Sequence, residues 1–572
     1  MEKNSADIFF FFSLPFFFFP PMACSKIFSG NLPELLNEII QYFRTDFLTL
    51  HSCILVNRLW CRLAIPLLWE DPFSNPTANY HFIRNFLYNL NDNDKRKLIE
   101  YEINIDLISS NTLFNYPNYI KCLNTWKIFH YIEKWIDFIK LGTSLNSDKI
   151  REISKIIYNS ILKNENNINL RTFEIILIRD HDYFNDILEL ILQNQNLILN
   201  IKNLKISFNG IIKTTNIFYD FLKFLYNNCK TISILYFHHK MNYDDLLIIK
   251  YCSELIISQQ NLEKMLFGFH IYNSIFLSLK NSNCSNTLKT IIFYNINFKN
   301  ITNFKQVIEQ LNVLKSIHIL YCFSLNYDFI QQIININKPF KLTSLFMKEK
   351  FQIDNFQALL QISGDYLENI GLLTSNKLKY QLLEIIIKYC KNIKFFDLPG
   401  FDYQNIYLSM DLIKKFNNHH LNYIIIDFDR LHILNQPNDD ILNISSIILK
   451  ELGQILPLKL EYLDLSLSID ENIFEIFLKN SQNTFIKKLL INNKIQIGNE
   501  NILSFIKEYI MKKKKIDYFA FKMKDDSDDS IEKCKDLFFM KDEVKIFESY
   551  NIKVQNYGDL KIQHYSYIEE MY

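Results

Sequence analysis

The residues of this chain that could do chemistry are its clusters of histidine and aspartate, because these side chains bind metal ions and move protons. One such cluster is Asp180-His181-Asp182, which follows an apolar, strand-like run. That place fits a turn between a strand and a helix, with Asp182 capping the helix. The pairs His238-His239 and His419-His420 are adjacent, and neighbouring side chains on a regular element do not readily converge on one ion. We therefore expect no metal site here.

The cysteines and glycines also argue against catalysis. None of the ten cysteines forms a Cys-x-x-Cys pair, and their spacing is wide. Zinc sites use closely paired cysteines, whereas scattered free cysteines are typical of a reducing compartment. The chain has only ten glycines and contains neither G-x-G-x-x-G nor a P-loop. No Ser/His/Asp or Cys/His arrangement has a supporting local motif. We expect a protein that is not an enzyme and that holds no cofactor.

Charge excludes a second group of functions. The chain of 572 residues has 63 Lys plus Arg and 62 Asp plus Glu, a formal net charge of +1. Without a basic excess the sequence does not predict nucleic-acid binding. The length allows several domains or one elongated array.

Residues 1–21 form a phenylalanine-rich leader. Ile8–Phe19 resembles the apolar core of a signal peptide, but Pro15 interrupts it, and Glu2 and Asp7 stand where a signal needs net positive charge. The run is also too short to span a bilayer as a helix. Met22 would be a sensible alternative start. We expect a disordered or spuriously included leader and no membrane association, although a cleaved signal would make this a secreted receptor.

The segment 31–72 predicts three short helices. Apolar residues recur at helical spacing after Pro33, again after Asp46, and a third time from Arg58 to Trp69. Pro33 suits a first helical turn, Asp46 can cap the second helix, and Pro66 should start a new turn. Three helices in about forty residues make a small core, so such a unit usually completes it against a partner or the next domain.

The same segment resembles the F-box family. Leu32-Pro33, Glu34-Leu35-Leu36, Ile39, Val56-Asn57-Arg58-Leu59-Trp60 and Leu68-Trp69 match the family pattern in order and spacing. The resemblance implies docking onto the Skp-type adaptor of a cullin-based ubiquitin ligase. The residues that it places at the adaptor or in the core of the helical module are Leu32, Pro33, Leu36, Ile39, Val56 and Trp60. An ordinary three-helix cap on the following domain is the other interpretation.

From Leu170 onward the chain repeats. The phrase apolar-x-x-apolar-x-apolar, the strand signature of leucine-rich repeats, occurs thirteen times, and all but one of the intervals are 25 to 31 residues. Its first positions are Leu170, Ile201, Ile232, Leu262, Leu288, Leu314, Leu342, Leu367, Ile393, Leu421, Leu460, Ile486 and Ile516. Helix-like segments such as 380–389 and 502–511 lie between them. Stacking of such units predicts a solenoid with a curved parallel sheet and outer helices.

Cysteines refine the repeat class. Cys229 and Cys390 each stand three residues before a strand, which resembles the cysteine-containing repeats common in F-box proteins. The Asn or Cys expected after each strand is present as Asn209 and Cys322 but is mostly missing. We therefore expect irregular turns.

Side chains that alternate with the buried apolar positions should face the concave side of the sheet. A mixture of aromatic and charged residues on a rigid curved surface suits protein binding. The target-binding candidates are His318, Phe346, Asp397, Tyr423, Asp427, Tyr462 and Asp464. The alternative for any one of them is a merely solvated position.

The sequence thus predicts an α/β fold class, with an N-terminal three-helix F-box followed by a leucine-rich-repeat solenoid. The expected segments are the leader 1–21, the F-box 28–72, a helical linker region 73–165 with helices at 79–90 and 119–141, the array 166–524 and a C-terminal cap or tail 525–572. The resemblance implies a cytoplasmic or nuclear substrate-recognition subunit that binds an adaptor, through it a cullin, and an unknown target protein. A non-catalytic repeat scaffold is the main alternative.

Overall fold

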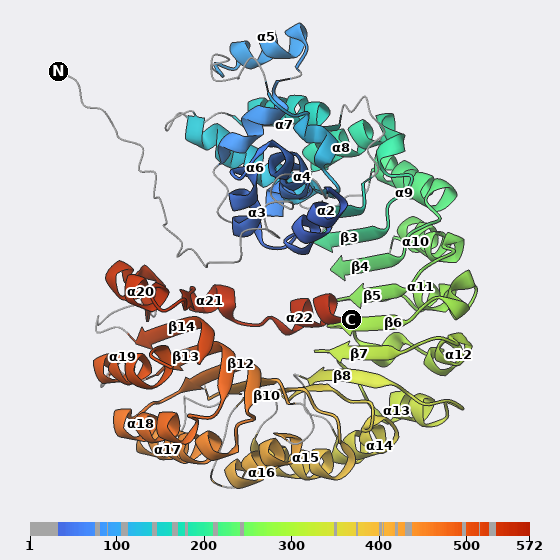
Figure 1. Ribbon diagram of the computed structural model, residues 1–572. Coiled ribbons are helices and arrows are strands. Elements are labelled where there is room, and N and C mark those ends of the chain that lie inside the picture. Colours follow the sequence, from blue (N-terminus) through green and yellow to red (C-terminus); the bar gives the residue numbers. More distant parts are fainter. Residues whose placement is uncertain are drawn as a thin grey trace, which may run out of the picture. The chain divides into compact units, whose positions relative to one another are not determined.

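The computed structural model describes two compact units, which we treat separately (Figure 1). The first runs to Thr172 and includes Gln193–Leu197, and the second comprises Phe173–Leu192 and Ile198–Tyr572. The described residues are 33–74, 80–88, 90–103, 112–139, 146–162, 170–177, 181–209, 215–240, 245–347, 352–372, 376–399, 403, 405–417, 421–428, 438–494, 499–513, 515–524 and 534–572. The leader 1–21 and Leu32 therefore lie outside them.

Three helices open the first unit: α2 (Pro33–Tyr42), α3 (Phe47–Ile54) and α4 (Arg58–Leu68). The Asp46 side chain caps α3 by accepting from the Thr49 N–H, and the Asn57 side chain caps α4 by accepting from the N–H groups of Leu59 and Trp60. These caps satisfy donors that a helix start leaves unpaired. Helix α4 continues through Pro66, where we expected a new turn.

The rest of the first unit is helical and irregular. Its elements are η1 (Pro72–Ser74), η2 (Tyr80–Phe86), α5 (Asp92–Glu100), η4 (Tyr116–Tyr119), β1 (Cys122–Asn124), α6 (Thr125–Ile139) and α7 (Ser147–Leu162). The helix predicted at 79–90 is a 3-10 helix, η2, and the one predicted at 119–141 is the shorter α6. Aromatic packing orders this region, because Phe73 and Phe86 are buried and their rings stack 5.8 Å apart.

Strands of the second unit lie side by side in the order in which they occur along the chain. Strands β3 to β14 pair in parallel, each with the next. The strands are β2 (Thr172–Leu177), β3 (Asn203–Asn209), β4 (Ile234–Lys240), β5 (Lys264–Gly268), β6 (Thr290–Tyr294), β7 (Ser316–Leu320), β8 (Leu342–Met347), β9 (Asn369–Leu372), β10 (Phe395–Pro399), β11 (Tyr423–Asp427), β12 (Lys459–Leu467), β13 (Phe485–Asn493) and β14 (Ile516–Lys524). Each begins within two residues of a predicted repeat start.

Helices connect successive strands and lie outside the curved sheet (Figure 1). They are α8 (His181–Gln193), α9 (Asn216–Asn228), α10 (Leu246–Ser258), α11 (Asn273–Ser278), α12 (Phe304–Gln310), α13 (Tyr327–Ile334), α14 (Ile353–Ser363), α15 (Asn376–Tyr389), α16 (Ile406–Asn417), α17 (Asn438–Ile455), α18 (Glu471–Asn480) and α19 (Asn499–Ile506). The turns η5 (Gln195–Leu197), η6 (Asn283–Asn286), η7 (Phe298–Asn300) and the π-helical η8 (Lys507–Met511) complete the connections. This repeating α/β solenoid fits leucine-rich repeats. Among the helices described, none is long and apolar enough to cross a membrane.

Turns after β5, β6 and β7 share one backbone geometry, whereas we expected irregular turns along the array; most of the other turns that follow strands lie outside the described residues. Phe269, Asn295 and Tyr321 each follow the last residue of a strand and have φ near +60°, at 67°, 57° and 56°. Their N–H groups donate to carbonyls at the end of the next strand, those of Tyr294, Leu320 and Phe346, at 2.8, 2.8 and 2.6 Å. These backbone bonds link neighbouring turns, and at the turn after β7 the Cys322 side chain adds a further link.

Buried cysteines link neighbouring repeats. The Cys322 thiol lies 3.4 Å from the Phe293 carbonyl, to which it donates, and accepts from the Ile296 N–H. The Cys229 thiol donates to the Ile198 carbonyl at 3.2 Å. Burial raises the pKa of both thiols to about 12, so they remain protonated packing groups.

The C-terminal region caps the array and then turns back onto it. Strand β15 (Cys534–Asp536) pairs antiparallel and β16 (Lys553–Val554) parallel with β14. The turn η9 (Leu537–Phe539) and helix α20 (Lys541–Glu548) separate these strands. The last helices, α21 (Tyr557–Leu560) and α22 (His564–Met571), lie on the inner side of the curved sheet (Figure 1).

Candidate functional site

The helical module α2–α4 has its own core and a second, exposed set of apolar side chains. Its core consists of Leu36, Ile40, Leu50, Cys53, Trp60, Ala64 and Leu68. On α2, α3 and the turn that follows, the exposed set consists of Leu35, Tyr42, Phe47, Leu48, Leu55 and Val56. Leu48 is 74% and Leu55 76% exposed, although neither is polar. Large apolar side chains that are exposed together in a small module are a feature of protein-interaction surfaces.

This division separates the predicted adaptor residues into two groups. Leu36 and Trp60 are buried in the core of the module, whereas Pro33 and Val56 are exposed and Ile39 is half-buried. Leu32 lies outside the described residues. Leu36 and Trp60 therefore hold the three helices together, and Pro33 and Val56 are free to meet a partner.

An ion pair closes the module. The Arg44 guanidinium, just after α2, donates to both carboxylate oxygens of Glu70, just after α4, at 2.6 and 2.7 Å. Two parallel bonds from a planar guanidinium fix orientation as well as distance. The pair ties the ends of α2 and α4 and so helps to hold the exposed set in a fixed geometry.

The inner face of the array is the second candidate site, and the C-terminal segment 557–572 covers it. One apolar cluster contains both strand side chains, such as Phe346, Phe395 and Tyr462, and the tail side chains Tyr557, Leu560 and Ile568. Of the predicted target-binding residues, His318, Phe346, Asp397, Asp427, Tyr462 and Asp464 are buried and Tyr423 is half-buried. The structure thus brings these residues together on one face, beneath a segment of the same chain.

Three aspartates on adjacent strands bind the tail. The Tyr557 hydroxyl donates to Asp464 at 2.7 Å, Lys561 pairs with Asp427 at 3.5 Å, and the His564 Nε2 lies 3.1 Å from Asp397. Asp397 and Asp464 flank Ile425 at the same register of β10, β11 and β12. The row of carboxylates on the strands therefore faces a row of donors on the tail.

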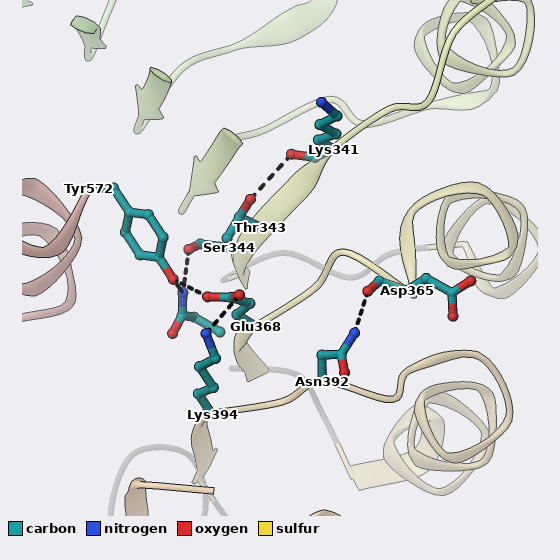
Figure 2. Close-up of polar contacts among 9 residues, drawn as sticks. Lys341, Thr343, Ser344, Asp365, Glu368, Asn392, Lys394 and Tyr572 are labelled. Carbon is teal, nitrogen blue, oxygen red and sulfur yellow. Dashed lines mark hydrogen bonds and ion pairs between the residues drawn. The ribbon is translucent and has the colours of Figure 1, made fainter. Parts of the chain in front are cut away.

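The end of the tail is held by Glu368, just before β9, by Asn369 of β9 and by His318 of β7. The Tyr572 hydroxyl donates to Glu368 at 2.6 Å and accepts from the Asn369 amide at 3.0 Å (Figure 2). Lys394 pairs with the same Glu368 at 2.8 Å, and the Asn369 amide also donates to Ser344. The Tyr572 ring packs 4.4 Å from the His318 ring. These contacts form one connected network.

Burial shifts the protonation of this face. It lowers the pKa of His318 to about 3, with a smaller effect from Lys264, and lowers the pKa of His238 to about 3. The neutral His238 lies 2.9 Å from the Tyr565 hydroxyl. Burial also raises the pKa of Asp464 to about 7. At neutral pH His238 and His318 are therefore neutral, and the Asp464 carboxyl is partly protonated.

A cleft of about 420 Å³ remains between the tail and β11–β13. Glu461, Lys487 and Lys488 line it from the strands, and Asp559 and Glu570 line it from the tail. Glu461 pairs with Lys487 at 3.1 Å, so charges of both signs meet within the cleft. This balance does not favour a ligand of either sign.

The structure shows where the described members of the histidine and aspartate clusters lie. His238 and His239 are consecutive on β4, so their side chains point to opposite faces of the sheet. Helix α8 begins at His181, which places Asp182 inside its first turn, and Asp180 and the pair His419-His420 lie outside the described residues. Among described residues, no group of three His, Cys, Asp or Glu is placed to hold a metal.

Sequence reasoning missed the residues with which the tail occupies the face. They are Tyr557, Lys561, His564, Tyr565 and Tyr572. One signal was available, since four of the last sixteen residues are tyrosine. In comparisons with known proteins, no family model matches this chain and no curated protein matches it significantly.

Proposed function

We propose that this chain is the substrate-recognition subunit of a cullin-based ubiquitin ligase. The helical module would bind a Skp-type adaptor, which in turn binds the cullin, and the repeat array would hold a target protein. The chain would be non-catalytic and would act in the cytoplasm or the nucleus. Its contribution to the reaction is proximity, because a bound target is raised in effective concentration beside the conjugating enzyme.

The exposed apolar set on α2 and α3 carries the proposal. A domain that only capped the array would need its core residues, but it would not need Leu48, Leu55 and Val56 in water. The match of the sequence to the F-box pattern supports the same surface, since Pro33 and Val56 belong both to that pattern and to the exposed residues.

Co-purification tests the proposal. We expect the tagged full chain to recover a Skp-type adaptor and a cullin from cells with the proteasome inhibited. The double variant Leu48→Asp with Val56→Asp should lose both proteins, because it places charge in the apolar interface without touching the core.

Leu113→Asp is the matched control, because Leu113 is 92% exposed in the same unit but outside the module. It should recover the adaptor as well as the wild type does. Equal recovery by all three proteins, or no recovery by the wild type, would favour the repeat-scaffold alternative.

A further inference from the structure

The tail is attached to the array differently from the repeats. The last backbone hydrogen bond to the sheet is that of the Gln555 N–H to the Phe519 carbonyl, at 3.0 Å. Beyond it, no backbone-to-backbone hydrogen bond joins 557–572 to the strands within the part of the chain that the structure describes. The hydrogen bonds that do join them use a side chain on at least one side, as in Ile562 N–H to Tyr462 hydroxyl at 3.1 Å. The segment is thus bound as a peptide ligand would be.

The face beneath the tail is polar at several points where a permanent core would be apolar. Asp397, Asp464 and His318 are at most 2% exposed, and each can ionise. Burying such groups costs free energy unless partners satisfy them. His318 hydrogen-bonds Ser344 within the sheet at 2.8 Å and packs against the Tyr572 ring. Asp397 and Asp464 find partners in the tail, in His564 and Tyr557. The pattern of the face therefore matches an aromatic segment that presents hydrogen-bond donors to the buried carboxyl groups.

We propose that the inner face is a binding site for an aromatic helical segment that brings a hydrogen-bond donor to each of Asp397, Asp427 and Asp464, and that residues 557–572 occupy it as a tethered competitor of the target. This inference rests on the proposed role of the array in protein binding and is independent of the adaptor. A target segment would bring imidazole, amine or hydroxyl donors to Asp397, Asp427 and Asp464, as the tail does, and apolar side chains to Phe346 and Phe395. The target segment would thus take the contacts that the tail makes and displace the tail.

The covalent tether gives the tail a large advantage over a free ligand. A segment joined to its site by a short linker has an effective concentration in the millimolar range, so a free ligand of the same chemistry competes poorly. Weakening the tail at its far end, while leaving the face unchanged, should open the site. Tyr565 and Tyr572 are suited to this because they contact His238, Glu368 and Asn369 only through their own side chains.

Fluorescence anisotropy tests the proposal with a labelled synthetic peptide of residues 556–572. We expect the peptide to bind the full-length double variant Tyr565→Ala with Tyr572→Ala at least 100-fold more tightly than it binds the wild type. A peptide of the same composition in shuffled order should bind neither protein. Equal affinity of the shuffled peptide, or no binding to a variant whose circular dichroism is native, would overturn the proposal.

Hydrogen exchange on the wild type gives a second test that needs no variant. If the tail leaves the face as a separate unit, amides of 565–572 exchange at least tenfold faster than those of β10 to β12. Exchange of both segments at one common rate would show the tail to be a fixed part of the core and would overturn the proposal. Neither result depends on whether an adaptor binds the helical module.

Discussion

At the scale of single residues, the inner face depends on a few buried polar contacts. Asp464 is 1% exposed, and its hydrogen bond from the Tyr557 hydroxyl is 2.7 Å long. A buried carboxyl that loses its donor keeps its desolvation cost without compensation. Such contacts give the clearest single-residue predictions.

Tyr557→Phe removes only that hydroxyl. We expect it to lower the free energy of unfolding by about 1–3 kcal/mol, the usual cost of leaving a buried polar group unpaired. Urea unfolding followed by circular dichroism measures the change. Tyr550→Phe, at a partly exposed tyrosine, should change stability by less than about 0.5 kcal/mol. Equal stability of the two variants would mean that the Asp464 contact contributes nothing.

Gly371→Ala tests the packing of the inner face. A Cβ atom at Gly371 would lie 2.6 Å from Cδ1 of Phe346 and 3.3 Å from Cβ of Asp397. Overpacking of this kind costs about 1–3 kcal/mol, and we expect that loss in thermal or urea unfolding. Gly558→Ala is the control, because the nearest atom to a Cβ at Gly558 would be the Asn556 side-chain oxygen, 3.2 Å away. A stable Gly371→Ala with an unstable Gly558→Ala would contradict this packing.

Acid should weaken the array through its buried histidines. The pKa of His318 is about 3 in the folded chain and returns to the ordinary 6.5 on unfolding. Between pH 6.5 and 3 the unfolded chain therefore binds the extra proton, so stability falls as pH falls through that window. His238 acts in the same direction, whereas Asp464, raised to about 7 from 3.8, opposes them. Two histidines against one aspartate give a net loss below pH 6.5.

His318→Gln should reduce this acid sensitivity. We expect the loss of unfolding free energy between pH 7 and pH 5 to be smaller than in the wild type by about 2 kcal/mol, from about 1.4 kcal/mol per pH unit below 6.5. Comparing the two pH values within each protein cancels the cost of the substitution itself. His51→Gln, at an exposed position on α3, should keep the wild-type difference. An unchanged difference in His318→Gln would contradict the assignment.

At the scale of elements, the helical module separates residues that build it from residues that it presents. Trp60→Ala should destabilise the module by about 3–5 kcal/mol, because the side chain is buried in its core. Val56→Ala should cost less than about 0.5 kcal/mol, since the side chain is 48% exposed. Limited proteolysis that follows cleavage within 33–69 measures both. Similar cleavage rates in the two variants would mean that the module has no such division.

The repeat strands could be predicted because each repeat is local. Leu288 and Leu460 mark β6 and β12 correctly, since the alternation lies within one short window and each is 26 residues from the next repeat start. The regular turns after β5 to β7 were not predicted. They depend on backbone hydrogen bonds to the next repeat, such as Asn295 to Leu320, rather than on a side chain that the sequence displays.

The candidate site was predicted only in part, because its other half is far away in the chain. The strand residues His318, Asp397 and Asp464 follow from alternation along a strand. Their partners in the tail do not, since Tyr572 and Glu368 are 204 residues apart and Tyr565 and His238 are 327 apart. No local pattern specifies which distant segment covers a sheet face.

At the scale of the whole molecule, the two units carry different parts of the proposed function. The first presents exposed apolar side chains on α2 and α3, and the second binds its own C-terminal segment on the inner face of its sheet. An adaptor should therefore act on the first unit, and a target on the second. A measurement that reports on both units in one experiment separates these roles.

Hydrogen exchange of the full-length chain with and without a purified Skp-type adaptor is that measurement. We predict that the adaptor slows exchange of the amides in 33–60 and leaves those in 557–572 unchanged. The same adaptor should give no protection to the double variant Leu48→Asp with Val56→Asp. Protection confined to the array, or no protection anywhere at saturating adaptor, would contradict the proposal that this chain is a ubiquitin-ligase receptor.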